Sequence, residues 1–242
     1  MRYADKTWQE AARMDSHLAI LPLGSFEQHG PHLPLGTDIY LIEAIAEGVA
    51  ERLNAFLLPV QPITTCYEHL GKKGSVHFSA DIFYRFIVCI AETLYRKEYH
   101  KIVILPGHGG IFILDPAVQY LNAAHPGLSL VSVNPYDIRG LPGYPFGTEG
   151  IHADDMETSL MLYIKPDLVD MSKAVDCIPD KPRPYLNYGS IFTLSPSGVW
   201  GTPTAATAEK GKWMLENAVE ATVHKINEWL REPEGNDIPG LY

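Results

Sequence analysis

The stretch HLAILPLGSFEQHGPHLPLGTDIYLIEAIAEGVAERL, residues 17–53, joins an apolar run, a loop rich in ionisable side chains and an amphipathic segment. Residues 17–23 are almost entirely apolar, which is typical of a strand buried on both faces of a parallel sheet. In residues 38–53, apolar side chains recur at helical spacing on one face, as Ile42, Ile45, Val49 and Leu53. The stretch therefore predicts a strand, a functional loop and a helix in that order.

Three further apolar runs predict strands at residues 55–60, 101–106 and 128–133, and the gaps between them leave room for helices. Helical stripes recur in residues 81–97, with Phe83, Phe86, Ile87, Ile90 and Leu94, and in the last helical segment, with Leu215, Val219, Val223, Ile226 and Leu230. Alternating strands and helices favour a three-layer α/β/α sandwich around a mainly parallel sheet, with right-handed crossovers.

The bulk composition limits the class of protein. The chain has 242 residues, 46% hydrophobic and 20% charged, which predicts one domain over residues 1–242. A net charge of −10 without a basic patch disfavours nucleic acid and anionic membranes as partners and leaves a small-molecule substrate. No apolar run is long enough to span a bilayer and the N-terminus lacks a signal-peptide core, so we expect a cytoplasmic protein.

Three scattered cysteines, Cys66, Cys89 and Cys177, form no CxxC pair and no even set. A disulfide framework is therefore not expected. We expect each cysteine to be a small buried apolar residue.

Ligand-type side chains follow two of the predicted strands. Glu27, His29 and Asp38 come after the first strand, and His108 comes after the third. In open parallel sheets the ligand crevice lies beyond the carboxyl ends of the strands, so these four side chains are expected to share one crevice. Carboxylate and imidazole are ligands of divalent Zn, Mn, Fe and Ni, and a carboxylate such as Asp38 can bridge two ions.

His152 and Glu157, five residues apart at the start of another helical segment, extend this candidate set. Simpler roles exist for each residue taken singly. Asp38 can cap the helix that follows it, Glu157 can complement a helix dipole, and a loop histidine can lie on the surface. The placement of all of them at strand ends makes a metal site the better interpretation.

Five segments, in order along the chain, carry a resemblance to a known family. They are LPLGSFEQHGPHLPLGTD (residues 21–38), GHGG (107–110), HADDMETSLML (152–162), KPDLVD (165–170) and GVWGTPTAATAEKG (198–211). Together they resemble the creatininase (creatinine amidohydrolase) family from about residue 21 to residue 212. The first segment alone is highly specific.

The resemblance implies a metal-dependent hydrolase with an α/β/α fold and two divalent metal ions (Zn, Mn or Fe), often assembled as a hexamer. By motif, Glu27 and His108 would hold one ion and His29 the other, with Asp38 bridging the two. His152 would match the catalytic histidine. His32 is not a ligand in that pattern, and we expect it to support the ligands by hydrogen bonding.

The sequence departs from the family pattern at three places. Creatininase has a glutamate ligand two residues after the strand-three histidine, where this chain has Gly110, and the resemblance suggests Glu157 as the replacement. A second role for Glu157, as a catalytic acid or base, stays open. Pro106 and Ile111 replace two amide residues that would orient the histidine loop.

The third departure concerns the substrate. The tryptophan that would pack a creatinine ring is Thr148 here, followed by Glu149, so creatinine is not the expected substrate. These polar residues, as predicted substrate-binding groups, slightly favour a hydroxylated, polyol-derived compound.

The expected reaction is attack of a metal-activated hydroxide on a carbonyl of a small cyclic or linear amide, with His152 passing a proton to the leaving group. Alternatives within the family are ring opening of an oxidised inositol (a keto-inositol) and hydrolysis of a formamide. A non-catalytic metal-binding paralogue is a further alternative. A dinucleotide-binding enzyme is disfavoured because GHGG is not GxGxxG.

Aromatic-rich loops at residues 185–192 and 197–201 would be unusual on a freely solvated surface. They are expected either to cover a neighbouring subunit of a homo-oligomer, which the family pattern implies to be a hexamer, or to pack on their own domain.

Overall fold

A computed structural model describes residues 5–13, 16–147 and 149–231. Its centre is a four-stranded parallel sheet in the order β2-β1-β3-β4. The strands are β1 (Leu18–Leu23), β2 (Phe56–Leu57), β3 (Lys101–Pro106) and β4 (Ser129–Ser132). All four predicted strands are present, but β2 has only two residues. It lies at the sheet edge and runs into Pro59, which has no N–H to donate to a ladder.

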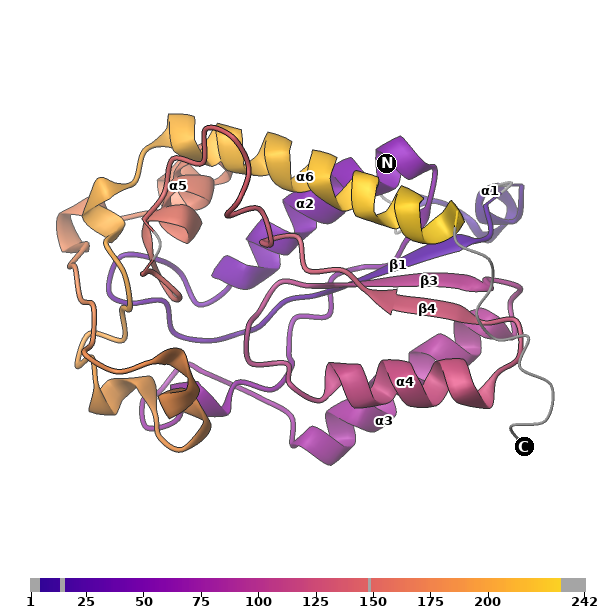
Figure 1. The fold of residues 1–242 in the computed structure, drawn as a ribbon, viewed down its shortest axis with the longest axis horizontal. Coiled ribbons are helices and arrows are strands. Elements are labelled where there is room, and N and C mark those ends of the chain that lie inside the picture. The colour runs from indigo at the N-terminus through magenta and orange to yellow at the C-terminus, as the bar shows by residue number, and fades with distance from the viewer. Residues whose placement is uncertain (1–4, 14–15, 148, 232–242) are drawn as a thin grey trace.

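Helices cover both faces of the sheet (Figure 1). One face is covered by α2 (Thr37–Leu53), α5 (Asp155–Ile164) and α6 (Ala208–Arg231), and the other by α3 (Ala80–Tyr95) and α4 (Leu114–Ala124). A short α1 (Trp8–Ala12) precedes β1, and its N-terminus is closed by a capping box between Thr7 and Glu10. This arrangement confirms the three-layer α/β/α sandwich.

Side-chain alternation along the strands divides the core into two halves. Ile20 and Val103 pack with α2, α5 and α6, whereas Leu21 and Ile104 pack with α3 and α4. Because both faces are covered, every residue of β1 is buried. This explains why the strand is a continuous apolar run rather than an alternating one.

The alignment of β1 with β3 determines where the functional loops begin. The strands pair in register from Leu18 with Lys101 to Leu23 with Pro106, so both end at the same level. Gly107 N then donates a hydrogen bond to Leu23 O at 2.7 Å. A Cβ on Gly107 would lie 2.7 Å from Ile42 Cβ of α2, so only glycine lets the two loops start this close to the helix.

Connecting segments carry several 3₁₀ turns, among them η2 (Tyr67–His69), η5 (Arg183–Asn187) and η6 (Ile191–Thr193). The segment with η5 and η6, in orange, lies beyond the carboxyl ends of the strands, on the same side of the molecule as the start of α5 (Figure 1). The aromatic-rich loop at residues 185–192 therefore lies at the end of the sheet where the ligand crevice is expected.

One smaller expectation needs correction. Cys66 is buried, but Cys177 is half-buried and Cys89 is exposed, so the prediction of three buried cysteines is wrong for Cys89. The predicted α6 stripe does face the core: Val219 and Ile226 are buried, and Leu215, Val223 and Leu230 are half-buried and pack against the same cluster.

The loop at residues 197–201 packs on its own domain, since Val199 and Trp200 are buried. Tyr188, in the other aromatic loop, is 88% exposed. In the described part of the chain, none of the helices is both long and apolar enough to cross a membrane.

The close contact between α5 and α6 generates a stability prediction at Gly211. A Cβ at this position would lie 1.9 Å from Ser159 O on α5. Replacing glycine by alanine inside a helix normally stabilises by about 1 kcal/mol, but overpacking against backbone costs more. We expect Gly211→Ala to lower the free energy of unfolding by about 1–2 kcal/mol in urea titrations.

Gly140→Ala is the matched control, because no heavy atom lies within 4 Å of a Cβ placed there. Its free energy of unfolding should change by less than about 0.5 kcal/mol. A Gly211→Ala protein that unfolds at the same or higher urea concentration than wild type would contradict this packing.

Candidate metal centre

The loop after β1 brings three ligand-type side chains into the interior. Glu27 and His29 are 0% exposed and Asp38, the second residue of α2, is 1% exposed. Backbone hydrogen bonds hold the loop in place, for example from Glu27 N to Leu35 O at 3.1 Å. The loop is therefore not a surface feature, and the surface interpretation of His29 is excluded.

His108 and Glu157 reach the same place from β3 and α5, and Asp38 lies between two groups of ligand atoms. Glu27 Oε1 is 3.1 Å and Asp38 Oδ2 is 3.4 Å from His108 Nδ1. His29 Nε2 is 3.1 Å from Asp38 Oδ1 and 3.7 Å from Glu157 Oε2. Each group has its ligand atoms within 4.8 Å of one another, the spacing of a metal site.

The two oxygens of Asp38 face different groups, as a bridging carboxylate requires. Glu27 Oε1 and Asp38 Oδ2 are also buried oxygens that form ion-pair contacts with imidazole nitrogens but accept no well-formed hydrogen bond from the described residues. A buried carboxylate oxygen without a donor is costly unless a cation compensates it. The donor set and these two oxygens fit divalent ions.

In His29 and His108, the ring nitrogen that points away from the ligand group has a contact of its own, and this contact orients the ring. His29 Nδ1 lies 3.2 Å from Glu27 O, a carbonyl that can only accept, so Nδ1 carries the proton and Nε2 faces Asp38. His108 Nε2 lies 3.4 Å from Glu68 Oε1, so its Nδ1 is directed at Glu27 and Asp38. Such outer partners fix the tautomer of metal-binding histidines.

Electrostatics in the cluster reflect the crowding of carboxylates and imidazoles. Burial lowers the pKa of His29, but Asp38, Glu157 and Glu27 together raise it to about 10. Burial and the neighbouring carboxylates Asp154 and Asp38 raise the pKa of Glu157 to about 8. Burial opposes ionisation of Glu27, yet His108 and His69 hold its pKa well below the ordinary range.

Sequence reasoning missed Glu68 and His69. Both lie in η2 on the segment after β2, where no motif or strand end singled them out, although an acid beside a histidine was the available signal. His69 Nε2 lies 3.0 Å from Glu27 Oε1, and its Nδ1 contacts Gln28 Nε2 at 2.9 Å. The 3.0 Å contact orients the carboxylate of Glu27.

Glu68 also explains the departure at Gly110. A Cβ at position 110 would lie 2.1 Å from Glu68 Oε1 and 2.4 Å from His108 Nε2. The carboxylate of Glu68 therefore occupies the space into which a side chain at position 110 would project. This chain therefore has glycine instead of glutamate at position 110, and the carboxylate of Glu68, from η2, lies beside it.

The GHGG loop is supported in ways that Pro106 and Ile111 do not reveal. Thr65 Oγ1 donates to Gly110 O at 2.9 Å and Arg183 Nη2 donates to Gly109 O at 2.8 Å. Ile111 is buried in the core with α3 and α4. Side chains from two distant segments thus replace the orienting amides expected from the family pattern.

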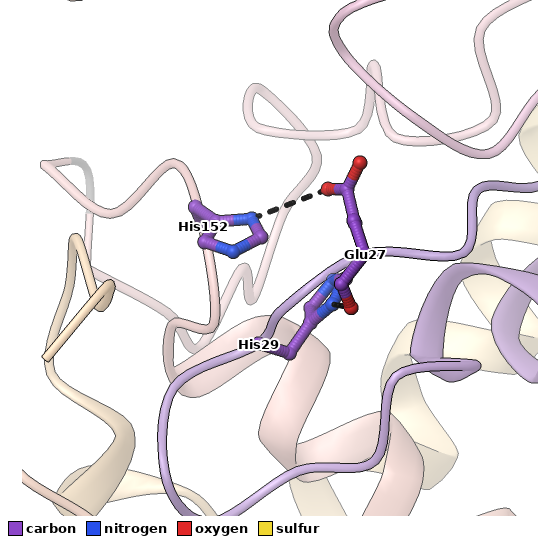
Figure 2. Close-up of side chains that lie close together, drawn as sticks. All are labelled: Glu27, His29 and His152. Atoms are coloured by element: carbon purple, nitrogen blue, oxygen red, sulfur yellow. Dashed lines mark hydrogen bonds and ion pairs between the residues drawn. The ribbon is translucent and has the colours of Figure 1, made fainter. Parts of the chain in front are cut away.

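His152 faces the cluster from the segment before α5 (Figure 2). Its Nε2 lies 2.7 Å from Gln28 O and 3.0 Å from Gln28 Nε2, and the shorter contact, to a carbonyl that can only accept, favours the tautomer with the proton on Nε2. Nδ1 lies 3.8 Å from Glu27 Oε1. Burial, with His69 and His29 nearby, lowers its pKa well below the ordinary value. In this form Nδ1 is a proton acceptor. Glu27, His29 and His152 also form a third group with ligand spacing.

His32 does not belong to either ligand group and contacts a neighbour of Glu157 instead. Its Nε2 contacts Thr158 Oγ1 at 2.9 Å, next to Glu157, and burial and then His29 lower its pKa to about 4. It therefore supports α5 directly and the cluster indirectly. Glu149 is exposed and does not line the cavity beside the cluster, and Thr148 lies outside the described residues.

A cavity of about 540 Å³ opens beside the cluster and is lined by both His108 and Glu157. This volume is typical of a small-molecule site. The Tyr136 hydroxyl is buried without a hydrogen-bond partner among the described residues, and Tyr136 lines the same cavity. Burial, then Asp38 and Glu157, raise its pKa well above the ordinary value, so the hydroxyl is a proton donor beside the cluster.

Comparison with known proteins shows the family of the chain. The family model for creatininase, creatinine amidohydrolase, matches residues 4–226. The mycofactocin precursor peptide peptidase of Mycobacterium ulcerans (strain Agy99) is 32% identical, covering 89% of this chain and 87% of that protein. The 3-dehydro-scyllo-inosose hydrolase of Thermotoga maritima is 29% identical, covering 89% of this chain and 77% of that protein.

The crystal structure of creatinine amidohydrolase (creatininase) superposes with a TM-score of 0.82 at 26% identity, covering 95% of this chain and 98% of that chain. Solved creatininases with this fold include a Zn-Zn form and a Mn form. The family match, the shared fold and the ligand groups agree, and the chain belongs to the creatininase family of metal-dependent hydrolases.

Proposed function

We propose that the protein hydrolyses a carbon–nitrogen bond of a small amide at a centre of two divalent ions, Zn, Mn or Fe. Glu27, His108 and Asp38 would hold one ion, and His29, Asp38 and Glu157 the other. The observation that carries this proposal is the placement of the two Asp38 oxygens, 3.4 Å from His108 Nδ1 and 3.1 Å from His29 Nε2. When bound, a pair of divalent ions acidifies a water molecule and polarises a carbonyl.

The chain's own groups supply proton transfer and orientation. His152, with Nε2–H held by Gln28 O, presents Nδ1 as the acceptor for the proton of the attacking water and later returns that proton to the leaving nitrogen. The Tyr136 hydroxyl is free to donate to an oxygen that gains negative charge during attack. Burial excludes bulk water from Glu27, His29 and Asp38, which strengthens these interactions.

An amide is preferred because one relative is a precursor peptide peptidase and another is a creatinine amidohydrolase. A keto-inositol is the second candidate, supported by the relative named 3-dehydro-scyllo-inosose hydrolase. The sequence favours a polyol-derived substrate only through Thr148 and Glu149. This support is weakened, because Glu149 does not line the cavity. A formamide belongs to the same amide class and shares its chemistry.

A non-catalytic paralogue is disfavoured by the structural roles of the three motif replacements. Pro106 ends β3, Ile111 fills the core, and Gly110 makes room for Glu68. Gly110 stands where the family pattern has a glutamate ligand, but Glu157 lies 3.7 Å from His29 Nε2 and can take that place in the second group. The enzyme interpretation therefore stands, with residues 1–242 acting as one hydrolase domain.

The remaining proposals concern the context in which the enzyme works. We propose a cytoplasmic homo-oligomer, a hexamer by analogy with the family pattern, without nucleic acid or membrane partners. The exposed Tyr188 ring, 88% accessible, supports a contact between copies. Light scattering of the purified protein tests the assembly.

Metal content tests the two groups of ligands. We expect the purified, metal-loaded protein to hold two divalent ions per chain by elemental analysis. His29→Ala should retain one ion, because Glu27, Asp38 and His108 stay intact, whereas Asp38→Ala should lose both. Asp115→Ala is the control, since Asp115 lines the same cavity outside both groups and should leave two ions in place.

Proton release on metal binding follows from the raised pKa values in the metal-free chain. At pH 7, His29, with a pKa of about 10, and Glu157, with a pKa of about 8, both hold protons that an ion must displace. Metal affinity should therefore fall as the pH is lowered from 9 to 6. Calorimetry in buffers of different ionisation enthalpy should show a buffer-dependent heat, and a buffer-independent heat would contradict the assignment.

His152→Ala tests the proton acceptor. We expect turnover of the best substrate among peptides, lactams, formamides and keto-inositols to fall by a factor of about 10²–10⁴ while metal content stays at two ions per chain. Loss of an ion would instead make His152 a ligand, as its group with Glu27 and His29 permits. Unchanged turnover would remove His152 from the mechanism.

A further inference from the structure

Arg183 forms part of the wall of the 540 Å³ cavity, although it is 75 residues distant in sequence from His108, which lines the same cavity. It is the first residue of η5, between Pro182 and Pro184, so two proline rings restrict the backbone on either side. The side chain crosses to the GHGG loop and donates from Nη2 to Gly109 O at 2.8 Å. Gly109 directly follows His108, so the guanidinium lies close to the candidate metal centre.

The contact at Gly109 holds the guanidinium in a defined place. A Cβ on Gly109 would lie 2.7 Å from Arg183 Nη2, so a larger residue there would displace the arginine. Anchoring an arginine at one nitrogen reduces the rotamer entropy that binding a ligand would otherwise cost. Although Arg183 is exposed, this contact directs its guanidinium toward the cavity wall.

Among the described residues, no acidic side chain neutralises the charge of Arg183. Its one hydrogen bond there is to the neutral carbonyl of Gly109. Four of its five N–H donors are left for another partner. Apolar residues such as Phe112 and Leu114 line the cavity beside it, so the guanidinium is a cation at the edge of a partly apolar surface.

Three other charged residues of the cavity, Arg139, Asp154 and Glu157, already have partners within the protein, and Asp115 is an acid that cannot pair with an anion. Arg139 donates to Gly150 O at 2.7 Å and lies near Asp154, so it belongs to the loop before His152. Asp154 caps α5 by accepting from Met156 N and Glu157 N. Glu157 faces His29. Arg183 is thus the charged lining residue best placed to meet a substrate.

We propose that Arg183 binds an anionic group of the substrate, a carboxylate or a phosphate, while the hydrolysed carbonyl lies at the metal centre. This proposal rests on the proposed function and narrows its substrate to small amides that carry a negative charge. A planar guanidinium with paired free donors matches a carboxylate in a two-point contact, and a phosphate offers the same chemistry. A second cavity of about 420 Å³ also borders Arg183, so larger substituents near the anionic group have room.

Hydroxamate ligands test the proposal without requiring turnover. Three probes share a succinyl-length chain with a metal-binding hydroxamate at one end and a carboxylate, a phosphonate or a neutral carboxamide at the other. We expect calorimetry on the metal-loaded protein to give the carboxylate or phosphonate probe an affinity about tenfold or more above that of the carboxamide. The arm that binds tighter identifies the preferred anion.

Arg183→Gln should remove this preference, reducing the ratio of affinities to about twofold or less, while the carboxamide probe binds as it does to wild type. Arg85→Gln is the matched control, because it removes the same charge from an exposed position on α3 and should keep the preference. Lysine at position 183 should restore part of it, since the charge returns without the planar geometry.

Each other outcome overturns the proposal in a distinguishable way. If no probe binds the metal-loaded wild type, the metal centre itself is wrong and the proposed function fails with it. If all probes bind wild type equally, the centre stands and the anion site fails. If Arg183→Gln weakens charged and neutral probes alike, Arg183 only supports the GHGG loop.

Discussion

The crowding of five ionisable ligand-type side chains into one buried space is the constraint on which the rest of the structure depends. Ionised carboxylates in the interior are costly unless cations or donors compensate them. Glu27 Oε1 and Asp38 Oδ2 accept no well-formed hydrogen bond from the described residues and face only imidazole nitrogens, 3.0–3.4 Å away. In the metal-free chain, protons held by His29 and Glu157 supply part of the compensation, as their raised pKa values indicate. Divalent ions would supply it more completely, which links metal binding to the stability of this end of the sheet.

Small residues give other segments access to this space. Gly110 leaves room for the carboxylate of Glu68, and Gly109 leaves room for the guanidinium of Arg183. The two side chains come from η2 and η5, which are far apart in the sequence, and both contact the loop that carries His108. Glu68 and Arg183 therefore both contact the GHGG loop, and they support it in place of side chains within the loop itself.

The tautomers of the histidines connect the fold to the chemistry. Backbone carbonyl oxygens of Glu27 and Gln28 accept from His29 Nδ1 and His152 Nε2, which leaves the opposite nitrogen of each ring facing the cluster. Two rings from different loops thus direct their second nitrogens at the same space, His29 Nε2 toward Asp38 and His152 Nδ1 toward Glu27. The backbone of a single short loop, residues 27–29, determines what both rings can do.

The sequence by itself determined the layers, the strand and helix order and the ligand-type residues, because burial on both faces imposes continuous apolar strands and because motif residues follow strand ends. Only the tertiary structure decided that Glu68 and His69 lie against His108 and Glu27, that Glu149 lies outside the cavity, and that Arg183 reaches Gly109. The physical reason is the separation in sequence between the residues that come into contact. Periodicity and spacing record contacts within a segment, whereas contacts between loops more than 35 residues apart depend on how the parallel strands align and on where glycine leaves space.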